Sequence, residues 1–86
     1  MIQKRNLEAC EHAYEYWKQN TTHSIEVKTI CLELAKQLMA LIKTSAPVSE
    51  FLVLQQKCEE HQIDKMGYGG FGLHSAIIAV LSDLGS

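Results

Sequence analysis

The sequence predicts an all-α fold, a small four-helix bundle with a long central helix at about residues 24–44. Apolar residues recur at intervals of three and four along four stretches of the chain, which is the period of an amphipathic helix. No two stretches show the alternation that would let strands pair with one another. The 86 residues are 47% hydrophobic, which is too apolar for a disordered chain and suits one domain. We therefore expect a single helical domain over residues 1–86.

The first expected helix covers residues 3–19. Its apolar side chains alternate at spacings of three and four and define the face that we expect to point into the core. These residues are Leu7, Cys10, Tyr14 and Trp17. Three glutamates gather on the opposite side, so we expect this exposed face to repel a phosphate backbone.

The central helix is the strongest feature of the sequence. We expect it to begin after an N-cap at Ser24 and to end near residues 44–46, because Pro47 disfavours helical geometry in the residue before it. Its apolar side chains cover an arc of roughly 220°, and one neighbouring helix covers about half of that. The other helices of the monomer can cover the remainder, but we favour a second copy across a two-fold interface. The expected interface residues are Ile25, Leu32, Ala35 and Met39.

Two further helices are expected, at residues 47–61 and 73–84. The apolar run at residues 51–54 is compatible with a strand, but the residues after it lack strand alternation, so we favour a helix. The run at residues 77–81 is rich in β-branched side chains, and a strand there stays open as an alternative. A lone strand would have no partner for its hydrogen bonds, so we expect a helix that Gly85 terminates.

A glycine-rich segment at residues 67–72 connects these last two helices. Its glycines match the pattern G-x-G-x-x-G, which brings backbone N–H groups close to a phosphate. The fragment GYGGFGLH also resembles the glycine-rich loop of protein kinases, but the other kinase motifs are absent from this chain. No strand pattern precedes the segment, so we interpret it as a connection between helices. We expect Tyr68, Phe71 and His74 to form a partner-binding loop.

The three cysteines, Cys10, Cys31 and Cys58, are odd in number and fall among apolar helix positions. This pattern predicts buried, reduced thiols and a cytoplasmic location. Cys58 and His61 lie one helical turn apart, but a structural zinc site needs four ligands and no second pair completes one. We therefore expect no metal and no cofactor. A small enzyme that uses cysteine and histidine, or a ligand-binding protein, stays an alternative because both residue types are present.

The charge balance argues against nucleic acid as the main partner. Eight basic and ten acidic residues give a formal net charge of −2, and the lysines are spread along the chain. Nucleic-acid binding depends on clustered positive charge. Residues 49–84 can be drawn as a helix-turn-helix, which keeps a nucleic-acid-binding regulator as an alternative, but the second helix offers no basic residue to read bases.

No apolar run approaches the roughly 18 residues that a membrane-spanning helix needs, and polar and charged side chains interrupt the first ten residues. We therefore expect neither a signal peptide nor a membrane anchor. The expected function is a non-enzymatic protein-interaction or regulatory module, a homodimeric helical bundle with a protein partner that the sequence does not name.

Overall fold

The computed structural model describes residues 1–19, 22–65 and 72–85. Within these ranges the chain forms four α-helices and one short 3₁₀ turn, and no strand. The elements are α1 (Lys4–Gln19), α2 (Ile25–Lys43), α3 (Val48–Glu60), η1 (Ile63–Lys65) and α4 (Leu73–Asp83). The predicted all-α bundle with a long central helix is therefore confirmed, and the last element is a helix.

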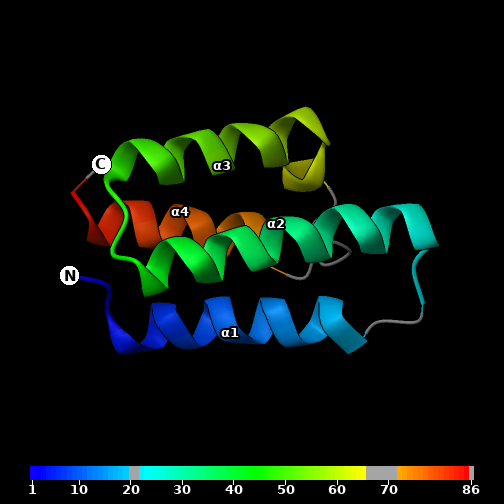
Figure 1. Cartoon of the computed structure of the whole chain (residues 1–86), viewed down its shortest axis with the longest axis horizontal. Helices are drawn as coiled ribbons and strands as arrows, with labels where there is room; N and C mark the ends of the chain where they lie inside the picture. Colours follow the sequence, from blue (N-terminus) through cyan, green and yellow to red (C-terminus); the bar gives the residue numbers. More distant parts are fainter. Residues whose placement is uncertain (20–21, 66–71, 86) are drawn as a thin grey trace.

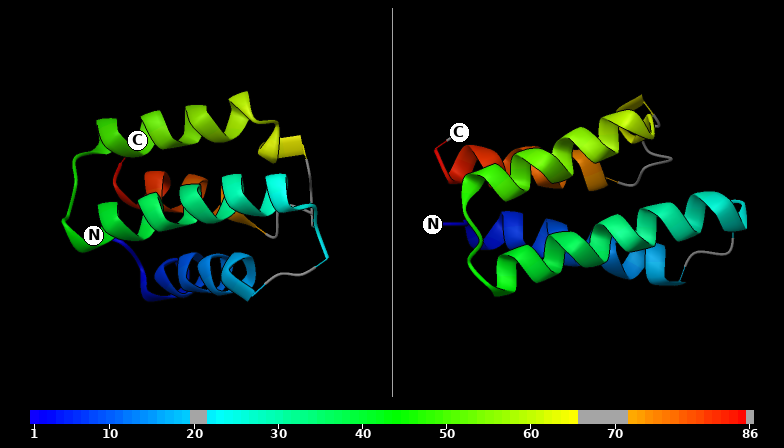
Figure 2. Two further views of the ribbon diagram at one scale, coloured as in Figure 1. Left: turned by 45° about the vertical axis from the view of Figure 1, so that its right-hand side comes forward. Right: turned by 45° about the horizontal axis from the view of Figure 1, so that its top comes forward.

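The helices run alternately in opposite directions, and both termini lie at the same end of the bundle (Figure 1). α1 packs against α2 and α4, and α3 packs against the same two helices from the other side. The two rotated views agree that α2 and α3 lie side by side (Figure 2). α3 is therefore an outer helix that has α2 along one flank and α4 along the other.

The ends of α2 and α4 follow from local sequence. The hydroxyl oxygen of Ser24 accepts a hydrogen bond from the backbone N–H of Val27 at 3.3 Å, which is the N-cap predicted for α2. α2 ends at Lys43, four residues before Pro47. α4 ends at Asp83, and Gly85 adopts a φ of 83°, the left-handed conformation that glycine tolerates after a helix.

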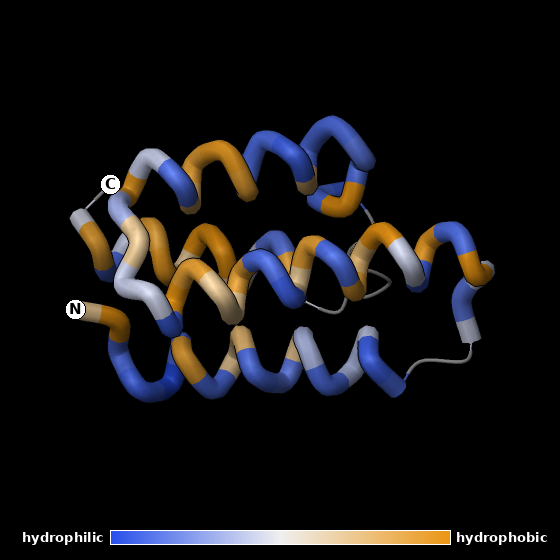
Figure 3. The backbone as a smooth tube through the Cα atoms, in the orientation of Figure 1, coloured by the Kyte–Doolittle hydropathy of each residue, from blue (hydrophilic) through white to orange (hydrophobic). Residues whose placement is uncertain are grey.

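All four helices contribute fully buried side chains to one core. Trp17 comes from α1, Leu38 from α2, Phe51 from α3 and Ile77 from α4. Hydrophobic and hydrophilic segments alternate along α2 and α3, as expected for helices with one buried side (Figure 3). None of the described helices is both long and apolar enough to cross a lipid bilayer.

Candidate protein interface

The residues predicted to face a second copy along α2 lie in three different environments. Ala35 is 1% exposed and belongs to the core of the monomer, so it offers no surface to a second chain. Leu32 and Met39 are half-buried and pack against that core. Ile25 alone among the four is exposed, at 75%, and it sits at the first position of the helix. The wide apolar arc of α2 is therefore covered largely from within the monomer.

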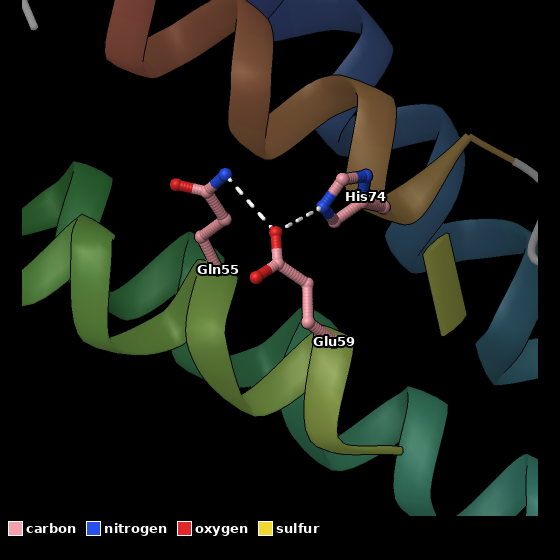
Figure 4. Close-up of polar contacts among 3 residues, drawn as sticks. All are labelled: Gln55, Glu59 and His74. Atoms are coloured by element: carbon pink, nitrogen blue, oxygen red, sulfur yellow. Dashed lines mark hydrogen bonds and ion pairs between the residues drawn. The ribbon is translucent and has the colours of Figure 1, made fainter. Parts of the chain in front are cut away.

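His74 lies in the first turn of α4, where it joins that helix to α3. Its Nε2 atom is 3.2 Å from Oε2 of Glu59, and the side-chain amide of Gln55 donates to the same oxygen at 3.2 Å (Figure 4). The geometry gives His74 a structural contact between two helices. Tyr68 and Phe71, the other residues of the expected partner-binding loop, lie outside the described residues.

The three thiols are buried, and burial makes them poor nucleophiles. Removal from water raises the pKa of Cys10 and of Cys31 to about 11. It also raises the pKa of Cys58 to about 12, with smaller contributions from the nearby Cys31 and from acidic neighbours. At neutral pH these thiols stay protonated, and the thiolate is the form that attacks a substrate or binds a metal.

The two side chains with zinc-type spacing do not share an environment. Cys58 is fully buried in α3, whereas His61 is exposed at the C-cap of the same helix. Within the described ranges, no group of three or more His, Cys, Asp and Glu side chains is arranged to hold a metal ion.

α3 and α4 are antiparallel neighbours in the bundle (Figure 1). A helix-turn-helix instead joins its helices at about 90–120°, so that the second helix can project into a groove of DNA. The exposed side of α4 carries neutral side chains such as Ser75 and Ser82, and the helix contains no lysine or arginine. This arrangement gives the nucleic-acid alternative no support.

The clearest surface feature is on α3, whose outer side exposes large apolar side chains. Val53 is 48% exposed and Leu52 is 44% exposed, although each is one residue away from a core position. The two are separated by about 100° around the helix, so they face different flanks. Val53 faces α2, where it helps to line a groove. Leu52 lies within about 20° of Glu59 around the helix, and Glu59 contacts His74 of α4, so Leu52 is on the α4 flank. On that flank Ile78 of α4 is 41% exposed.

The groove between α2 and α3 has a volume of about 170 Å³. Its lining is mixed, with apolar side chains in the middle and polar ones toward both ends. The lining residues are Gln37, Ala40 and Leu41 of α2, and Glu50, Val53, Leu54 and Lys57 of α3. Nζ of Lys57 donates to the side-chain oxygen of Gln37 at 3.4 Å, which bridges the two helices at one end of the groove.

Sequence reasoning did not single out this surface, although a signal was present. Residues 51–54 are four consecutive apolar residues, and successive positions of a helix point about 100° apart. A helix with one buried side can therefore bury only some of these four side chains. Phe51 and Leu54 are buried, whereas the two between them are left exposed.

No family model matches the chain, and no curated protein or solved structure is significantly similar to it.

Proposed function

We propose that this protein is a non-enzymatic protein-interaction module that acts as a homodimer, with the groove between α2 and α3 as the contact surface. The observation that supports the proposal most directly is the exposed Val53 at the centre of that groove. In the groove lining, the apolar Val53 lies between the polar side chains of Glu50 and Lys57. Such an arrangement is typical of protein interfaces, which have an apolar middle and a polar rim.

Association would benefit a chain of this size. A domain of 86 residues buries a smaller fraction of its surface than a larger one, so additional buried apolar area is a substantial gain. Covering the exposed part of a valine contributes roughly 1 kcal/mol per copy. A two-fold dimer uses the same patch twice, so Val53 is covered in both subunits.

The alternative functions have weaker support from the described residues. A cysteine nucleophile would need an ionised thiol, and all three thiols have raised pKa values. Nucleic-acid recognition would need basic side chains on the exposed side of a helix, and α4 contains no lysine or arginine. The groove on α3, by contrast, is present and lined by side chains that can contact another protein.

The test is sedimentation velocity of the protein over a range of micromolar concentrations. We expect a concentration-dependent increase of the sedimentation coefficient from monomer to dimer. Val53→Lys should weaken association, because it places a charge at the centre of the contact. Leu52→Lys is the matched control, since Leu52 has nearly the same exposure but lies on the other flank. A wild-type protein that stays monomeric throughout would refute the homodimer.

A further inference from the structure

We infer that the second copy docks with its α3 antiparallel to the first, so that Glu50 of each copy faces Lys57 of the other across a two-fold axis beside Val53. The inference rests on the proposed function, because it specifies the register of the dimer proposed above. Charge complementarity within a single stripe of α3 supports it.

Glu50, Val53 and Lys57 form one stripe along α3. Their spacings of three and four residues place them on the same side of a helix, and all three line the groove beside α2. Seven residues of α-helix span about 10.5 Å, so the carboxylate and the amine are anchored about 5 Å on either side of the midpoint. The stripe therefore has an apolar centre, a negative end and a positive end.

Such a stripe is complementary to itself in one direction only. When two copies of α3 run antiparallel about the midpoint between residues 53 and 54, position 50 of one copy lies opposite position 57 of the other. Two symmetric pairs of opposite charge then flank two valines. When the helices run parallel in register, Glu50 faces Glu50 and Lys57 faces Lys57, and like charges repel. The charges thus favour the antiparallel dimer.

The α2 side of the groove is compatible with this arrangement. Ala40 is exposed and small, so the backbone of a partner helix can approach closely at the centre of the contact. Gln37 is neutral, and its hydrogen bond with Lys57 holds the amine at the edge of the groove without neutralising its charge. Apart from Glu50 and Lys57, no residue that lines the groove is charged. Glu60 lies one turn beyond Lys57 on the same side of α3, past the end of the groove, and in the antiparallel register it lies opposite position 47, outside the partner's α3.

Exposed ion pairs contribute little affinity, but they determine orientation and discriminate against wrong partners. The experiment therefore compares charge variants by sedimentation velocity, with circular dichroism to verify that each stays helical. Glu50→Lys and Lys57→Glu alone should each raise the dimer dissociation constant about tenfold, because each turns both pairs into repulsive contacts. The double variant E50K/K57E exchanges the two charges and should return the dimer dissociation constant close to the wild-type value.

Glu8→Lys is the matched control, because it makes the same change of net charge as E50K on the exposed side of α1. We expect it to leave the dimer unchanged. A wild-type dimer on which E50K acts no more strongly than E8K would overturn the Glu50–Lys57 contact while leaving the homodimer intact. Weakening by both single variants without restoration in the double variant would overturn the antiparallel register. A wild-type monomer would remove the proposed function itself.

Discussion

Asn6 and Asp83 join the two ends of the chain across 77 residues of sequence. The side-chain amide of Asn6 donates to Oδ2 of Asp83 at 2.7 Å, and the backbone N–H of Gln3 donates to the same oxygen at 2.9 Å. The carboxylate thus lies at the N-terminus of α1, whose own first turn contains no acidic residue. It provides the negative charge that the helix dipole favours there. The last residue of α4 therefore stabilises the first turn of α1.

The first prediction concerns the pH dependence of this contact. Hydrogen bonds from Asn6 and from Gln3 lower the pKa of the Asp83 carboxyl from its ordinary value of 3.8. Because the pKa is lower in the folded state, the ionised group stabilises the fold above its ordinary pKa. That contribution is lost as the pH falls through the folded-state value. Asp83→Asn should therefore lower the melting temperature at neutral pH and lose its effect in strong acid.

Thermal unfolding followed by circular dichroism at several pH values measures this difference. Asp64→Asn is a suitable control, because Asp64 is an exposed aspartate in η1, at the other end of the bundle (Figure 1). An equal effect of both substitutions at neutral pH would argue against a specific role of Asp83.

The second prediction compares two apolar residues of α2. Leu38 is fully buried, whereas Ile25 is mostly exposed. Leu38→Ala should lower the free energy of unfolding by about 2–5 kcal/mol, because it removes buried apolar surface and leaves a cavity. Ile25→Ala should change it by less than about 0.5 kcal/mol. Urea denaturation at protein concentrations below the dimer dissociation constant measures both values. Similar losses for the two variants would contradict the burial of Leu38 and the exposure of Ile25.

The third prediction tests the N-cap of α2. Ser24→Ala removes the hydroxyl that accepts from the N–H of Val27, and we expect a loss of about 0.5–1 kcal/mol in the free energy of unfolding. Ser24→Asp should retain most of the stability, since aspartate is an equally good cap and its charge suits the helix N-terminus. If denaturant unfolding cannot separate the alanine variant from wild type, the cap does not contribute.

The fourth prediction concerns the thiols. With a pKa of about 11, only about a thousandth of the Cys10 and Cys31 side chains is ionised at about pH 8. An aromatic disulfide reagent should therefore react slowly with all three cysteines of the native protein and rapidly with those of the unfolded protein. The absorbance of the thiolate that the reagent releases measures both rates. One cysteine that reacts fast in the native state would point to an accessible, activated thiolate.

The raised pKa values of the same thiols predict that the protein is less stable at alkaline pH. Their folded-state pKa values lie above the ordinary value of 9.0, so the buried, protonated form stabilises the fold fully below that value. This contribution is lost as the pH rises through about 11 for Cys10 and Cys31, and through about 12 for Cys58. Above pH 9 the melting temperature of wild type should therefore fall more steeply with pH than that of a Cys58→Ala variant. Parallel curves for the two proteins would show that Cys58 does not contribute.

Much of the helical architecture could be predicted from local patterns. The spacing of apolar residues identified all four helices, because a helix with one buried side repeats its apolar positions every three to four residues. Ser24 and Gly85 identified ends of α2 and α4, because cap residues act on neighbouring backbone groups. The width of the apolar arc on α2 also predicted correctly that several elements must cover it.

The apolar pattern of α2 did not show which element covers each part of its apolar arc. Ala35, which is predicted to contact a second copy, is enclosed by neighbouring helices within the monomer. Val53 lies on the side of α3 away from the core, and its place in a groove depends on how closely α2 approaches. Both outcomes depend on the rotation of one helix against another, which periodicity does not specify.

The sequence alone determined where the helices form and which side of each avoids water, because propensity, capping and apolar spacing act between residues a few positions apart. Only the tertiary structure decided which surfaces remain exposed and which distant side chains meet. Asp83 is unfavourable at the C-terminal end of its own helix, where the dipole is negative, and its stabilising contact comes from Asn6 on α1. Such contacts depend on the packing of distant helices, and so does the exposure of Val53.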